Sequence, residues 1–266
     1  MQGRLLPPID GRIQAFPAAD WRAEFARAAE AGLAAIEWIY EQPACEVNPI
    51  ATDQGLEELA ALSARHGVAV RSVCADYFMD QTLVRAGGAL PSRAAHLAWL
   101  IARCRVAGIE RVVLPFVDAS DVKTASEEDA LVDTLREAER LATAAGVELH
   151  LEMSFGPARF ANFMERLPDT IRVNYDSGNS AALGYHPREE FAAYGGRIGS
   201  VHVKDRLRGG TTVPLGQGNA DLPAFFAALR TVGYNRDIIL QVARGDAGRE
   251  IEWARQNLAY VQAALA

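Results

Sequence analysis

The stretch VELHLEMSFGPARFANFMERLPDTIRVNYD, residues 147–176, contains the unit that decides the fold. Short runs rich in Val, Ile and Leu at 147–153 and 171–176 predict two buried strands. The residues between them predict a helix over 158–167. A strand, a helix and a second strand in this order are typical of a parallel sheet covered by helices.

The same alternation continues outward from this unit to both ends of the chain. Further strands are predicted at 2–6, 34–40, 68–75, 111–117, 198–205 and 237–243. Helices are predicted at 20–32, 53–67, 91–108, 126–145, 187–195 and 222–233, and one more closes the chain. Eight such units in 266 residues favour an α/β fold with a single (β/α)8 TIM barrel domain over 1–266. An open doubly wound sheet is the alternative, but no GxGxxG motif follows the first strand.

Charge and cysteine content exclude several classes of protein. The formal net charge of -7 argues against a nucleic-acid or membrane partner. Cys45, Cys74 and Cys104 form no CxxC pair, which favours reduced thiols over disulfides or structural zinc. The sequence has neither a signal-peptide core nor an apolar run of the roughly 18 residues that a membrane span needs. We therefore expect a soluble, cytoplasmic protein.

Polar side chains occupy the ends of the last four predicted strands. Active sites of such barrels lie at the carboxyl ends of the strands, where this sequence has Glu152, Asp176, His202 and Gln241. Neighbouring strands lie about 4.8 Å apart, so these side chains can converge on one point. Oxygen ligands with one nitrogen suit Mn²⁺, with Mg²⁺ or Co²⁺ as alternatives. The set predicts one divalent metal site, whereas any single member has a helix cap or a loop salt bridge as its alternative role.

Four runs of the chain resemble the xylose isomerase-like TIM barrel superfamily and, within it, the sugar phosphate isomerase/epimerase family. They are LHLEM (149–153), VNYDSGN (173–179), SVHVKDRLRGG (200–210) and IILQVARG (238–245). The resemblance implies that Glu152, Asp176 and His202 bind the metal and that Arg208 contacts the substrate. Two positions depart from the family pattern: Gln241 stands where a glutamate is usual, and Asn179 where some members have a histidine.

The predicted function is a metal-dependent isomerase or epimerase acting on a sugar, keto-sugar or sugar phosphate. A metal-stabilised enediolate with Glu152 as the base accounts for the ligand set. One carboxylate is enough for a 1,2 shift, but Gln241 cannot accept a proton, so a two-base epimerisation loses one of its groups. Lys204 should face the same side of its strand as His202. It is the candidate proton donor, with an ion pair to Asp176 or Glu152 as the alternative.

Six further residues are candidates to bind the substrate. Arg206, Arg208 and Arg244 carry guanidinium groups suited to a phosphate or to hydroxyls, with a solvated basic loop as the alternative. Asn179 can hydrogen-bond a hydroxyl, and His186 lies on a loop above the strands. Glu37 ends the second strand and is either a base across the barrel or a member of a salt bridge.

Two other functions remain open from the sequence. An inosose-dehydratase-like lyase would use the same metal chemistry and expel a hydroxyl. A non-catalytic sugar-binding barrel is favoured by Gln241, since a fold does not fix a function. A nuclease of the same superfamily is disfavoured because the chain has only five histidines and is acidic. The outer helices of a barrel also allow a homo-oligomer.

Overall fold

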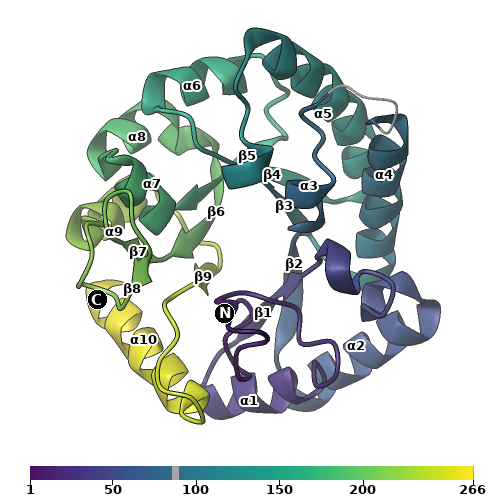
Figure 1. Ribbon diagram of the computed structural model, residues 1–266, viewed down its shortest axis with the longest axis vertical. Helices are drawn as coiled ribbons and strands as arrows, with labels where there is room; N and C mark the ends of the chain where they lie inside the picture. The colour runs from purple at the N-terminus through teal and green to yellow at the C-terminus, as the bar shows by residue number, and fades with distance from the viewer. Residues whose placement is uncertain (86–89, 266) are drawn as a thin grey trace.

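Seven parallel strands wind around a common axis in a computed structural model of the chain, which describes residues 1–85 and 90–265. Their order in the sheet is β1-β2-β3-β4-β5-β6-β9, so strands next to each other in the chain lie side by side. The helices form a ring outside the strands (Figure 1). This is the predicted α/β TIM barrel with a nearly closed parallel sheet, and it excludes the open doubly wound alternative.

The strands and helices have the following bounds. The barrel strands are β1 Ala35–Ile39, β2 Ala69–Cys74, β3 Arg111–Phe116, β4 Glu148–Met153, β5 Arg172–Asp176, β6 Ile198–Val203 and β9 Ile238–Leu240. A two-residue antiparallel pair, β7 Asp205–Arg206 and β8 Thr212–Val213, follows β6. The helices are α1 Ala23–Ala31, α2 Asp53–His66, α3 Tyr77–Asp80, α4 Leu90–Ala107, α5 Ala125–Ala145, α6 Pro157–Glu165, α7 Ser177–Leu183, α8 Pro187–Tyr194, α9 Leu222–Thr231 and α10 Glu250–Leu265.

The first strand, predicted at 2–6, does not form. The segment still occupies the position in the barrel that was predicted for it. Gly3 has a φ of 56°, which breaks an extended strand. The segment nevertheless lies between β9 and β1, because the Gln2 N–H donates to the Leu240 carbonyl at 3.2 Å and the Glu37 N–H donates to the Met1 carbonyl at 3.0 Å. Its main chain therefore bridges the two edges of the sheet.

Two short helices were not predicted, because each is too short to show a helical period. Helix α3 follows β2, and α7 begins directly after β5. The helix predicted at 126–145 begins at Ala125 instead, because Thr124 caps it and exchanges hydrogen bonds with Glu127. Helices α3 and α7 both lie at the carboxyl ends of the strands, where they shape the site.

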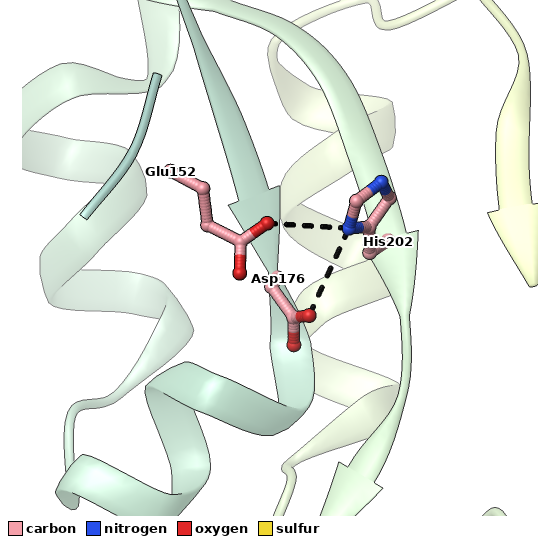
Figure 2. Close-up of side chains that lie close together, drawn as sticks. All are labelled: Glu152, Asp176 and His202. Atoms are coloured by element: carbon pink, nitrogen blue, oxygen red, sulfur yellow. Dashed lines mark ion pairs between the residues drawn. The ribbon is translucent and has the colours of Figure 1, made fainter. Parts of the chain in front are cut away.

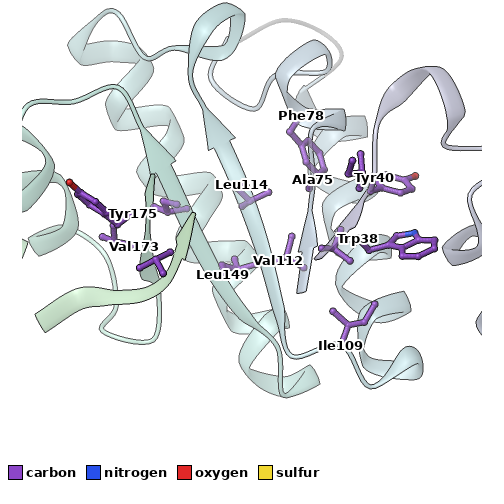
Figure 3. Close-up of a cluster of buried hydrophobic side chains, with 14 of the residues drawn as sticks. Trp38, Tyr40, Ala75, Phe78, Ile109, Val112, Leu114, Leu149, Val173 and Tyr175 are labelled. Carbon is purple, nitrogen blue, oxygen red and sulfur yellow. The ribbon is translucent and has the colours of Figure 1, made fainter. Parts of the chain in front are cut away.

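Apolar side chains fill the space between strands and helices, as the labelled residues in Figure 3 show for one part of the core. Trp38 is 1% exposed, and its ring lies 5.5 Å from that of Phe16 and 5.6 Å from that of Trp21. Burial of a large apolar side chain contributes about 1.5–3 kcal/mol, so this packing anchors β1. Among the described residues, no helix is both long enough and apolar enough to cross a bilayer.

Candidate metal centre and active site

Three buried side chains from consecutive strands meet at the carboxyl end of the barrel (Figure 2). Glu152 lies on β4, Asp176 ends β5, and His202 lies on β6 in register with Asp176. His202 Nδ1 is 3.3 Å from Glu152 Oε2 and 3.8 Å from Asp176 Oδ2. One ligand atom from each residue falls within 4.8 Å of the others, a spacing that fits a divalent metal ion.

The other nitrogen of His202 is held from behind by a carboxylate. His202 Nε2 lies 2.7 Å from Glu37 Oε1, and both side chains are fully buried. Burial alone would lower the pKa of His202, but Glu37, Asp176 and Glu152 together raise that pKa well above its usual value. The carboxylates around His202 thus favour a positive charge at this point, and Glu37 fixes the ring in the orientation that a metal-binding imidazole needs.

Asp176 both starts a helix and faces the centre. Its Oδ1 accepts hydrogen bonds from the backbone N–H groups of Gly178 and Asn179, at 2.8 and 2.7 Å, and so caps α7. Its Oδ2 lies 3.0 Å from Lys204 Nζ. Burial would raise the pKa of Asp176, but Lys204 and His202 hold it well below its usual range. A Cβ on residue 178 would lie 2.5 Å from Lys204 Cγ, so glycine is needed there for the lysine to approach.

Gln241 follows β9 and is the fourth ligand predicted from the sequence. Its Nε2 donates to Gln2 Oε1 at 2.6 Å, which leaves the amide oxygen for another partner. That oxygen is buried and has no hydrogen-bond partner in the described part of the chain. A buried polar atom without a partner is costly unless something binds it. The residue types and this orphaned oxygen therefore fit one divalent cation held by Glu152, Asp176, His202 and Gln241.

Two asparagines fix the carboxylate of Glu152. Asn174 Nδ2 donates to Oε2 at 2.8 Å from within the barrel, and Asn179 Nδ2 donates to Oε1 from the rim. Asn179 in turn accepts a hydrogen bond from Arg206 Nη1 at 2.8 Å. Donors to both oxygens hold the carboxylate in one orientation at the base of the site.

A cavity of about 500 Å³ opens above the centre. Its walls include Glu152, Asn179, Lys204, Arg206 and Gln241, which were all candidates from the sequence, together with Asp76, which was not. Loss of hydration raises the pKa of Asp76 to about 6, although Cys74 and Gln14 donate hydrogen bonds to it. Asp76 lies two residues after the end of β2, so the strand-end rule that singled out the metal ligands could also have found it.

Four predicted substrate-binding residues are not among those that line this cavity. Arg208 is exposed and follows the β7 strand, and the cavity wall carries Arg206 instead. Arg244 donates to the carbonyls of Gly3, Leu6 and Ile13 and so holds the N-terminal segment. His186 caps α8, with Nε2 3.3 Å from Asp221. Glu37, the fourth predicted residue outside the cavity wall, lies behind His202.

Comparison with known proteins matches the chain to one family of barrels over most of its length. The family profile described as xylose isomerase-like TIM barrel matches residues 25–263. An inosose dehydratase of Geobacillus kaustophilus is 31% identical over 149 residues, which is 47% of this chain and 48% of that protein. The match therefore spans about half the length of the curated relative.

Solved structures share the fold at low sequence identity. The structure of an L-ribulose 3-epimerase has a TM-score of 0.79 at 21% identity and covers 100% of this chain and 93% of its own. A xylose isomerase-like TIM barrel protein from Mycobacterium smegmatis, in complex with magnesium, has a TM-score of 0.72 at 21% identity and covers 98% and 94%. At this identity the likeness supports the architecture alone.

Proposed function

Because the chain belongs to the xylose isomerase-like TIM barrel family, we propose that it is a divalent-metal-dependent isomerase or epimerase acting on a sugar, keto-sugar or sugar phosphate. The observation that carries the proposal is the buried set of Glu152, Asp176 and His202 below a cavity of about 500 Å³. Mn²⁺ is the cation that we expect, because the donors are mostly oxygen with a single nitrogen. A sugar epimerase of the same fold agrees with this choice of substrate class.

The metal would be held by Glu152, Asp176, His202 and Gln241, and when bound it supplies Lewis acidity toward a substrate carbonyl and the adjacent hydroxyl. Glu152 then takes the proton from the carbon that bears the hydroxyl. Its carboxylate is ready for this role because the amides of Asn174 and Asn179 hold both of its oxygens. The same carboxyl group returns the proton to the neighbouring carbon, and the hydroxyl proton passes to the former carbonyl oxygen, which gives a 1,2 shift without a second base.

Lys204 is the second reacting group in this proposal. Lys204 lines the cavity and its ammonium lies 3.0 Å from Asp176 Oδ2, so a positive charge stands beside the metal ligands. A cation there stabilises the negative charge that develops on a substrate oxygen when Glu152 removes the proton. Asn179 and Arg206 line the same wall and are placed to bind substrate hydroxyls.

Proton exchange from substrate carbon into solvent tests the proposal. We expect the wild type with saturating Mn²⁺ to incorporate deuterium from D₂O into at least one member of a panel of sugars and sugar phosphates. Glu152→Gln should lower that exchange by about a hundredfold or more, because an amide cannot accept the proton. Glu165→Gln is the matched control, since Glu165 is an exposed residue at the end of α6. Exchange that survives Glu152→Gln would remove Glu152 from its role.

A lyase is the second candidate, and the inosose dehydratase similarity favours it. The same chemistry up to proton removal would then end with loss of a hydroxyl as water. Mass spectrometry of the products separates the two, because an isomerase conserves mass and a dehydratase product is lighter by one water. A wild type that binds Mn²⁺ but exchanges no carbon-bound proton would contradict both and point to a non-catalytic sugar-binding barrel.

A further inference from the structure

A line of polar side chains runs down the inside of the barrel from Glu152 to the opposite face. The interior of such barrels is normally filled by branched apolar residues. Here Glu148, His150 and Glu152 alternate along β4, so all three side chains face the same side of that strand. Asn174 on β5 and Ser200 on β6 are cross-strand neighbours beside them.

Consecutive hydrogen bonds join these groups into one chain, which we name the barrel relay: Glu152, Asn174, Ser200, His150 and Glu148. Asn174 Nδ2 lies 2.8 Å from Glu152 Oε2, and Ser200 Oγ lies 2.6 Å from Asn174 Oδ1. His150 Nδ1 lies 2.7 Å from Ser200 Oγ, and its Nε2 lies 2.8 Å from Glu148 Oε2. Glu148 pairs with Arg236 at the wall of a second cavity of about 610 Å³.

Hydrogen bonds order the part of the relay next to Glu152 in one direction. The Glu152 carboxylate accepts from the Asn174 amide N–H, so the Asn174 oxygen turns toward Ser200 and accepts its one hydroxyl proton. His150 contacts Ser200 Oγ through Nδ1 and Glu148 through Nε2. The orientation of the Asn174 amide therefore depends on Ser200, and the position of the Ser200 hydroxyl depends on His150.

The central side chains of the relay are buried and tightly packed. His150 is 0% exposed, Asn174 2% and Ser200 3%. A Cβ on residue 199 would lie 2.7 Å from His150 Cε1, so Gly199 is needed to admit the imidazole. In the described residues none of these three side chains has a buried polar atom without a partner. Polar groups so deeply buried are costly when one partner is removed, so a break at any member disturbs its neighbours.

We propose that Asn174, Ser200 and His150 are positioning residues that fix the carboxylate of Glu152 for metal binding, and that Glu148 on the opposite face contributes to the same setting. This inference rests on the proposed function only in taking Glu152 as a metal ligand. Groups that orient metal ligands typically change metal affinity by 10–100-fold when they are removed.

Calorimetric titration of the metal-free protein with Mn²⁺ alone tests the relay. Ser200→Ala should raise the Kd about tenfold, because Asn174 loses the donor that fixes its amide. Glu148→Gln, at a side chain that is 38% exposed, should raise the Kd about threefold across the length of the barrel. The double variant should bind no more weakly than Ser200→Ala, since one break already uncouples the relay. Glu110→Gln is the matched control, because Glu110 lines the same lower cavity outside the relay.

Each result has a distinct meaning. Unchanged affinity in both single variants, or effects that add in the double variant, would overturn the relay and leave the proposed function standing. An equal loss in Glu110→Gln would also overturn it, because charge near the lower cavity would then explain the effect. A wild type with no affinity for Mn²⁺ would overturn both proposals. Thermal unfolding of each variant separates a loss of folded protein from a loss of affinity.

Discussion

At the scale of single residues, the molecule buries several ionisable groups. Only some of them have a partner that offsets the cost of removing them from water. Glu37 is fully buried but has His202 beside it, so its pKa falls below the usual value even though burial acts to raise it. Glu24 on α1 is 3% exposed, and one of its oxygens has no partner in the described residues. Burial raises the pKa of Glu24 to about 7.

The shifted pKa of Glu24 predicts a pH-dependent stability. In the unfolded chain the carboxyl loses its proton near pH 4.5, whereas in the folded protein it keeps the proton until about pH 7. The stability that the protonated form contributes is therefore complete below pH 4.5 and is lost as the pH rises through 7. Glu24→Gln cannot ionise, so we expect it to be more stable than the wild type by about 2 kcal/mol at pH 8 and nearly equal at pH 4.5.

Urea unfolding of both proteins at the two pH values checks this. Glu30→Gln on the same helix is the control, because the Glu30 side chain is 60% exposed. If Glu24→Gln is more stable by the same amount at both pH values, or no more stable at pH 8, the raised pKa of Glu24 is contradicted.

Single-residue patterns in the sequence found much of the site. Glu152, Asp176, His202 and Gln241 were predicted because strand ends on neighbouring parallel strands must lie close together. Asp76 was not predicted, because it lies two residues past the end of β2 and no pattern separates it from other loop carboxylates. Arg206, Arg208 and Arg244 were all candidates for the substrate, and of these Arg206 lines the cavity. Two residues of β7 and the turn after it decide which arginine reaches the cavity, and no periodicity reveals that. The relay residues look like ordinary strand residues until their partners are known.

At the scale of elements, the N-terminal segment takes the place of a strand and is tied down by side chains. Arg4 is 2% exposed and donates to the Val242 carbonyl at 2.9 Å and to Gln14 Oε1 at 3.0 Å. Arg244 donates to the carbonyls of residues 3, 6 and 13 at 2.7–2.9 Å. The sequence predicted the position of this element, but the positive φ of Gly3 prevents a strand ladder, and the two arginines replace it.

Replacing Arg244 tests whether these bonds hold the segment. Arg244→Lys keeps the charge but cannot donate to three carbonyls in a fork, so we expect a loss of about 2 kcal/mol in the free energy of unfolding. The measurement is urea unfolding at pH 7. Arg249→Lys, whose side chain is 57% exposed and pairs with Glu252 in the following helix, should stay within about 0.5 kcal/mol of the wild type. Equal losses in the free energy of unfolding in both variants would contradict the claim that the guanidinium of Arg244 holds the N-terminal segment.

At the scale of the whole molecule, the candidate metal site lies at one end of the barrel and a cavity lined by charged residues lies at the other. Strict alternation of strands and helices was enough to predict this architecture, because a parallel sheet of this length closes on itself. The total charge of -7 carried no information about the site, whose carboxylates are balanced locally by His202 and Lys204. The path of polar groups between the two ends depends on side-chain contacts between the neighbouring strands β4, β5 and β6, which no pattern along the chain encodes.

The central claim is that Glu152, Asp176, His202 and Gln241 hold one cation in common. The most direct test is an anomalous-difference map from a crystal of the protein soaked in Mn²⁺. We predict a single strong peak within bonding distance of Glu152, Asp176, His202 Nδ1 and Gln241 Oε1. A map with no peak there, or with the ion bound elsewhere while these side chains keep only their mutual contacts, would contradict the account.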